Sequence, residues 1–134
     1  MSQNIEGAIH SWWADGTIPA AVALNALLPV ARVFTGDKQI EESTFSPFAK
    51  INREGEPGAN YTNCGRRDDV LIRLTIWHEN EASGKAIADA AVACFDNQGR
   101  PPAIETIRKS NRFHIQEDDG VWQFVIDFLV NSNA

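Results

Sequence analysis

The segment from Asp69 to Asp96 changes its hydrophobic period in the middle, and this change constrains the fold more than any other feature of the chain. Up to His78 the apolar residues alternate, as they do in a strand with one buried face. From Ser83 they recur every three or four positions, as in a helix with one buried face. The pattern therefore predicts a strand that leads through a short polar link into an amphipathic helix.

Two helices are predicted before the first strand. A stripe of apolar residues at helical spacing runs from Ile5 to Trp13, with Ser2 as the expected N-cap and Gly16 as the expected stop. The apolar stretch 18–30 contains two prolines near its ends and predicts a short helix or helical turn.

Strand-like and loop-like segments follow. Segments 31–37 and 47–52 have the apolar pattern of strands, and the polar stretch 37–46 between them predicts a loop. Two glycines and a proline within 53–60 predict that the second strand ends there, in a loop or at the end of a hairpin. The pattern of 61–69 does not distinguish a strand from a connection.

The chain closes with a predicted hairpin. Segments 104–116 and 121–131 flank an acidic turn that contains Asp-Gly, one of the strongest short hairpin signals. The order of elements predicts an α+β fold: an antiparallel β-sheet with an N-terminal helix and a central amphipathic helix packed on one face. A length of 134 residues predicts one domain, 1–134.

Composition excludes several classes of protein. An apolar fraction of 43% and a charged fraction of 22% are those of an ordinary globular protein, and a net charge of −6 opposes binding to nucleic acid. The N-terminal residues lack the pattern of a signal peptide, and no apolar run approaches the roughly 18 residues of a membrane helix. Two cysteines are too few for a disulfide framework, and Cys94 lies on the apolar side of the predicted helix, where we expect it to be buried.

No catalytic, cofactor-binding or metal-binding motif is present. His78, Glu79 and Glu81 have the residue types of a metal or acid/base site, and a small hydrolase-type enzyme that uses them is one alternative. They lie in the link between strand and helix, however, where polar and capping residues are expected in any case. A second group of such residues lies at the end of the predicted hairpin and consists of His114, Glu117 and Asp118.

Two features suggest contact surfaces. Basic residues cluster only at Arg66-Arg67 and within 108–112, which fits a solvated face or a surface that forms ion pairs with a partner. Trp13 is expected to be partly exposed. Trp77 points away from the apolar face of its strand, which suggests that this second face of the sheet is covered, by another subunit among the candidates.

In order and spacing, several segments resemble the tail-completion, or tail-terminator, proteins of long-tailed bacteriophages, also called tail-to-head joining proteins. The resemblance covers nearly the whole chain. It rests on the N-terminal amphipathic helix, "ARVFTGD", "PFAKIN", the strand-to-helix segment "VLIRLTIWHENEASGKAIADAAVACFD" and the terminal "DDGVWQFVIDFLV".

The resemblance implies a small α+β subunit, not an enzyme and without a cofactor, that assembles into a ring, usually a hexamer, at the head-proximal end of the tail tube. Such a ring ends tube polymerisation and joins the tail to the head. Its partners would be other copies of itself, the tail tube protein and the head–tail connector, in the virion and, during assembly, in the host cytoplasm. Genomic DNA would pass through the lumen without specific binding, and a net charge of −6 agrees with this. Another neck protein, such as a head-completion adaptor, is the second alternative.

In an acidic subunit that meets identical subunits, arginines are the natural partners of acids on a neighbour. We therefore expect Arg66 and Arg67 to face Glu41-Glu42 or the acidic hairpin turn of the next copy. The residues predicted to lie at the interface are Arg66, Arg67, Glu41, Glu42, Trp77, Asp118 and Asp119. Because association costs several kcal/mol in lost freedom, we expect a monomer at low micromolar concentration.

Overall fold

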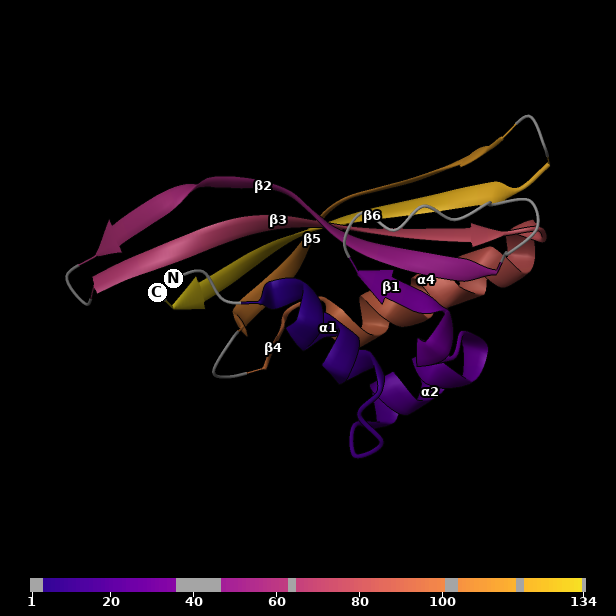
Figure 1. Ribbon diagram of the computed structural model, residues 1–134, viewed down its shortest axis with the longest axis horizontal. Coiled ribbons are helices and arrows are strands. Elements are labelled where there is room, and N and C mark those ends of the chain that lie inside the picture. The colour runs from indigo at the N-terminus through magenta and orange to yellow at the C-terminus, as the bar shows by residue number, and fades with distance from the viewer. Residues whose placement is uncertain (1–3, 36–46, 63–64, 101–103, 118–119, 134) are drawn as a thin grey trace.

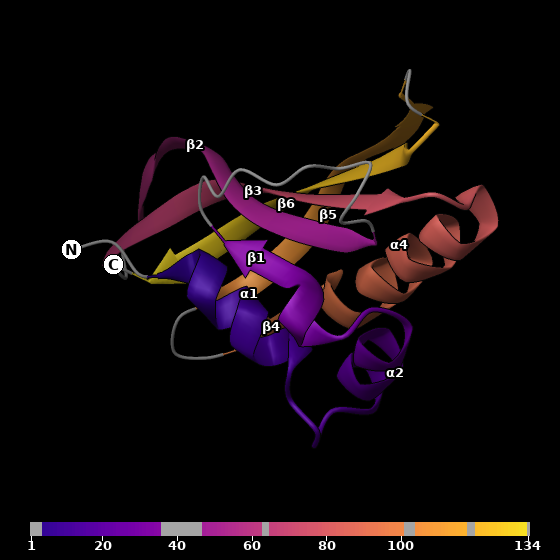
Figure 2. The same ribbon diagram turned by 45° about the vertical axis from the view of Figure 1, so that its right-hand side comes forward.

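The computed structural model describes residues 4–35, 47–62, 65–100, 104–117 and 120–133, with side chains described outside 55–68 and 132–133. Within these residues, three α-helices lie on one side of a six-stranded sheet: α1 and α4 contact its strands and α2 packs on α4 and α1, as Figures 1 and 2 show from two directions. Helices gathered on one face of a largely antiparallel sheet are the mark of an α+β protein, so the predicted fold class is confirmed.

The sheet is mixed, with one parallel pairing at its edge. The strands are β1 (Val33–Thr35), β2 (Phe48–Thr62), β3 (Gly65–His78), β4 (Gln98–Arg100), β5 (Ile104–Gln116) and β6 (Trp122–Asn133). They pair in the order β1-β2-β3-β6-β5-β4. The short β1 runs parallel to β2, and the other described pairings are antiparallel. The last strand of the chain thus lies in the middle of the sheet, between β3 and β5.

The helices cover what we call the inner face of the sheet; the opposite side is the outer face. They are α1 (Ile5–Trp13), α2 (Pro19–Leu27) and α4 (Glu81–Phe95), and a 3₁₀ turn, η1 (Val30–Arg32), precedes β1. The rings of Trp12 and Phe128 both meet the ring of Phe95 edge-on, at centroid distances of 5.0 and 6.1 Å. The inner face is lined by alternate residues of the two central strands, namely Val70, Ile72, Leu74, Ile76, Phe124, Ile126, Phe128 and Val130.

The helix ends differ in part from the sequence prediction. The N-cap of α1 is Asn4, whose side chain accepts a hydrogen bond from the Gly7 amide at 2.9 Å, so the assignment of Ser2 as the cap is wrong. The N-cap of α4 is Asn80, which accepts from the Ser83 amide at 2.9 Å. After α4 the left-handed residue is Asn97, with φ of 61°, and asparagine tolerates that conformation better than most residues.

The prediction that a loop interrupts the chain at 53–60 is wrong. Strand β2 continues through this segment and pairs with β3 as far as Thr62 opposite Gly65. The pairing shifts register between Arg53 and Gly55 and again between Gly55 and Gly58, so the glycines and the proline fall at irregularities of the ladder. Such bulges accept these residues because the local hydrogen bonding is already broken.

The long β2–β3 and β5–β6 hairpins point away from each other, toward opposite ends of the molecule in Figure 1. Cys94 is buried on α4, as predicted, and burial raises the pKa of its thiol to about 11.

In the part of the chain that is described, no helix has the length and apolar character needed to cross a membrane.

Asp15 connects the turn after α1 to the edge strand β4. One carboxylate oxygen accepts from the amide and hydroxyl of Thr17, at 2.8 and 2.6 Å, and the other accepts from Arg100 at 2.9 Å. These hydrogen bonds, first those of Thr17 and then that of Arg100, lower the pKa of Asp15 from 3.8 to about 2. The charged form of Asp15 is therefore favoured by the folded state.

The substitution Asp15→Asn should make the stability of the fold depend less on pH in the acidic range. A carboxyl whose pKa is lower in the folded chain stabilises the fold above its ordinary pKa of 3.8, and this contribution disappears as the pH falls through about 2. The melting temperature of the wild type should therefore exceed that of Asp15→Asn at neutral pH, and the two should converge between pH 3.8 and about 2. Thermal melts followed by circular dichroism across this range measure the difference. A difference of the same size at pH 7 and at pH 2 would contradict this role.

Candidate interaction surface

Trp77, predicted to lie under a cover on the second face of the sheet, is buried there by its own chain. Its ring stacks on the ring of Phe48, directly opposite on β2, with centroids 4.6 Å apart and planes 13° from parallel. Val121 completes this small cluster, and only 7% of Trp77 is exposed. The side chain of Trp77 thus has a partner within the subunit, and its place at an interface stays a prediction.

The other predicted interface residues are described only in part. Arg66 and Arg67 lie in β3, opposite Tyr61 and Asn60 of β2, close to the turn of the long hairpin. They belong to a paired strand, which is one of the two alternatives that the sequence left open for 61–69; their side chains lie outside the described part. The remaining four predicted residues, which are outside the described residues altogether, are Glu41, Glu42, Asp118 and Asp119.

His78 serves the turn between β3 and α4. Its Nδ1 accepts a hydrogen bond from the Asn80 amide at 2.9 Å, and burial lowers the pKa of the imidazole despite the opposing charge of Glu79. An Nδ1 that accepts a backbone hydrogen bond is occupied by the turn itself. The geometry therefore gives His78 a structural part in starting α4, next to the Asn80 cap.

His114, in the second group of candidate residues, packs between aromatic side chains. Its ring stacks on Phe124 at a centroid distance of 5.2 Å and lies 5.8 Å from the ring of Trp122. Among the described residues, no group of three or more His, Cys, Asp or Glu side chains is arranged to hold a metal ion.

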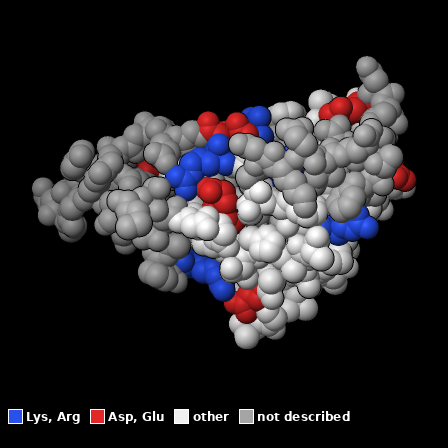
Figure 3. All heavy atoms as spheres, in the orientation of Figure 1, with Lys and Arg blue, Asp and Glu red and all other residues white. Residues whose placement is uncertain are grey.

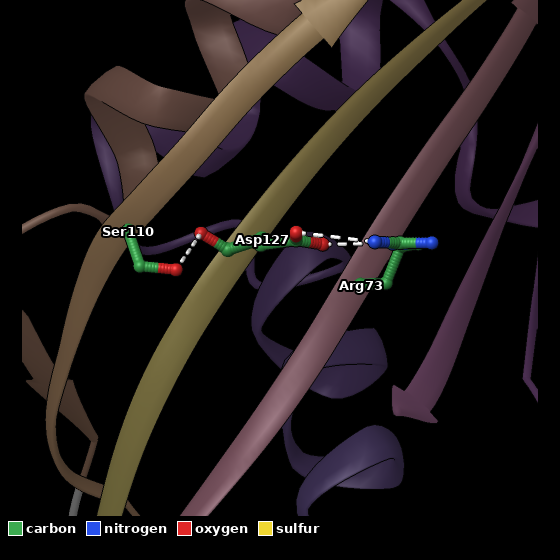
Figure 4. Close-up of polar contacts among 3 residues, drawn as sticks. All are labelled: Arg73, Ser110 and Asp127. Carbon is green, nitrogen blue, oxygen red and sulfur yellow. Dashed lines mark hydrogen bonds and ion pairs between the residues drawn. The ribbon is translucent and has the colours of Figure 1, made fainter. Parts of the chain in front are cut away.

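An ion pair spans the two central strands on the outer face. Arg73 of β3 lies directly opposite Asp127 of β6, and its Nε and Nη2 donate to the two carboxylate oxygens at 2.8 and 3.2 Å. Ser110 of β5 donates its hydroxyl to the Asp127 carbonyl at 3.3 Å, so three strands are joined at this point (Figure 4). The hydrogen bond to Asp127 raises the pKa of the Arg73 guanidinium above its ordinary value. Asp127 is only 7% exposed, and a carboxylate so placed requires a partner of this kind.

Two apolar patches face solvent on different elements. Val22 and Leu27 of α2 are 48% and 49% exposed, and Phe113 and Ile115 of β5 are 40% and 49% exposed. Figure 3 shows acidic and basic side chains beside one another over the sheet, whereas the area where α2 lies is mostly uncharged. The sequence contained a signal for the first patch that pattern reading missed: apart from Asn25, every residue of α2 is apolar, although only one side of the helix can face the core.

The comparisons with known proteins concern the fold. No protein-family model matches the sequence, and no curated protein matches it either. Solved structures do match, and one of them is a chain of the virion of a native gene transfer agent (GTA) particle. The match has a TM-score of 0.66 and covers 97% of this chain and 98% of that chain, at 12% sequence identity. At that identity the likeness establishes a common fold: the α+β arrangement described above is also that of a virion chain.

Proposed function

We propose that this protein is a structural subunit of a phage-like virion and that it acts as a tail terminator. In this role it forms a ring, a hexamer in the family that the sequence resembles, at the head-proximal end of the tail tube. The ring ends tube polymerisation and joins the tail to the head. The observation that carries the proposal is the fold match with a virion chain over nearly the whole length of both chains.

The chemistry of the described surface supports a role in contact between proteins. His78, the candidate acid/base residue, is engaged in a turn, and the outer-face ion pair of Arg73 and Asp127 holds strands together. Large apolar residues are exposed in two patches on a subunit whose net charge is −6. Exposed apolar patches of this kind are typical of surfaces that bind other proteins.

Particles made without this protein would test the proposal. A tail terminator limits tube growth, so its absence should give overlong tails and free heads, and antibody labelling of complete particles should mark the junction of tail and head. A head-completion adaptor, the alternative function, should instead be found on heads that were assembled in the absence of tails. Absence of the chain from purified particles would reject both functions.

The double substitution Arg66→Glu with Arg67→Glu should separate assembly from folding. Surface substitutions move stability by only about 0.5 kcal/mol, so the melting temperature should remain nearly unchanged. Reversal of two charges should repel acids of the neighbouring subunit and impair ring formation, giving overlong tails or tails that fail to join heads. Electron microscopy of particles and a thermal melt of the purified variant measure the two effects. Normal infectious particles, or a collapsed fold, would refute the assignment of these arginines.

A further inference from the structure

Helix α2 carries no charge and has Asn25 as its one polar residue, yet half of the helix faces solvent. Ala21, Leu24 and Leu28 pack into the core, and the opposite side of the helix is exposed. The residues of that exposed side, which we call the α2 face, are Pro19, Val22, Ala23, Ala26 and Leu27. A helix with so few polar residues is normally buried on most of its surface, and the exposure of the α2 face is therefore unusual.

The α2 face also lacks charge. No ionisable side chain occurs from Thr17 to Ala31, although the whole chain carries a net charge of −6. Two acidic copies repel each other wherever their charged surfaces meet, and a neutral apolar surface is where they can approach without that cost. A basic partner would be recognised by acidic residues, and a membrane-surface helix would carry lysines and arginines beside its apolar face. The composition of the α2 face therefore favours a second copy of this chain.

A second apolar patch lies on the β5–β6 hairpin and supplies the surface that α2 would meet. Phe113 stands opposite the buried Val125, and Ile115 stands opposite Gln123, so both project from the outer face of the sheet. We call Phe113 and Ile115 the hairpin patch. Helix α2 lies in the helix layer and the hairpin projects on the sheet side, well apart in both views (Figures 1 and 2). One copy cannot bring its own two patches together.

We infer that subunits join by a head-to-tail contact in which the α2 face of one copy packs on the hairpin patch of the next. A contact between two different patches leaves one free patch at each end, so it continues from copy to copy and closes into a ring when the rotation permits. This inference rests on the proposed ring and names the two surfaces that build it.

Substitutions on each side of this contact test it in solution. Leu27→Glu places a charge in the α2 face, Ile115→Glu places one in the hairpin patch, and Ala86→Glu adds the same charge at an exposed position of α4 as a control. Sedimentation velocity from low micromolar to about 1 mM should show wild-type self-association that either patch variant weakens at least about tenfold. The control should associate as the wild type does. Circular dichroism verifies that each variant folds. If Leu27→Glu or Ile115→Glu fails to fold, the single variants Val22→Glu, in the α2 face, and Phe113→Glu, in the hairpin patch, replace them.

A mixture of the Leu27→Glu and Ile115→Glu chains tests most directly whether the two patches bind each other. The Ile115→Glu chain keeps its α2 face and the Leu27→Glu chain keeps its hairpin patch, so the mixture should give a 1:1 dimer and no larger species. A mixture that stays monomeric, a wild type that stays monomeric at every concentration, or patch variants that associate as the wild type does would each overturn the inference. If rings form regardless of both substitutions, the proposed ring stands and only these surfaces are wrong. Absence of the chain from particles would remove the proposed function itself.

Discussion

Replacing Trp13 with alanine is expected to lower the free energy of unfolding by about 3–5 kcal/mol, the usual loss when a fully buried aromatic side chain is removed. Trp13 is 0% exposed and packs against Phe95, with ring centroids 6.1 Å apart. Its Nε1 donates to the carbonyl of Leu28, at the end of α2, at 2.9 Å. The substitution would therefore open a cavity and also leave a buried carbonyl without its donor. Urea denaturation followed by circular dichroism measures the loss.

Two further variants separate these contributions. Trp13→Phe keeps most of the ring volume and removes the Nε1 donor, so it should lose less than alanine but still about 1–3 kcal/mol for the unpaired carbonyl. Ser11→Ala, at an exposed position of the same helix, should stay within about 0.5 kcal/mol of the wild type. If Trp13→Ala were no more destabilising than Ser11→Ala, α1 would not be anchored in the way described.

The second large effect is expected at Gly84, in the first turns of α4. Alanine normally stabilises a helix by about 1 kcal/mol relative to glycine. Here a Cβ would fall on the ring edge of Phe124, at 2.9 Å from Cδ2 and 3.0 Å from Cζ and still closer to Cε2. Phe124 is 2% exposed and its ring is stacked by His114, so it has little room to retreat. Gly84→Ala should therefore destabilise the protein, by about 1–3 kcal/mol, as overpacked core positions do.

Gly16 provides a matched control for this prediction. A Cβ at Gly16 would meet nothing within 4 Å, so Gly16→Ala should leave the free energy of unfolding unchanged or raise it by about 0.4–1 kcal/mol. The substitution Phe124→Leu removes the obstructing ring. In that background, Gly84→Ala should lower the free energy of unfolding by less than it does in the wild type. Additive losses in this double-mutant cycle would mean that the two residues do not meet.

Part of the candidate surface was readable before the structure. Apart from Asn25, all residues of α2 are apolar, and no ionisable residue occurs from Thr17 to Ala31; both features are visible in the sequence and indicate a helix with more apolar surface than one buried side requires. The ion pair of Arg73 and Asp127 could not be found in this way. Pattern reading places each residue on the outer face of its strand, but their meeting depends on β3 lying beside β6 in one register.

Two errors of the sequence reading have their cause in contacts between different segments of the chain. Glycine and proline at 53–60 are turn residues by composition, yet pairing with β3 carries the strand through them, because register shifts remove the need for regular hydrogen bonds there. The expectation that Trp13 is partly exposed is wrong, because the side chain is fully buried. Its burial depends on α2 and Leu28, which approach from a direction that the periodicity of α1 does not contain.

Hydrophobic periodicity and turn residues are enough to predict which segments are helices or strands, the terminal hairpin and the α+β class. These signals act over a few neighbouring positions. It does not give strand order, the parallel placement of β1 or the partner of each outer-face side chain. Those depend on contacts between segments far apart in the chain, where packing and register select one pairing among many. For the same reason, the sequence shows that α2 is almost wholly apolar, and only the folded chain shows which of its sides remains exposed.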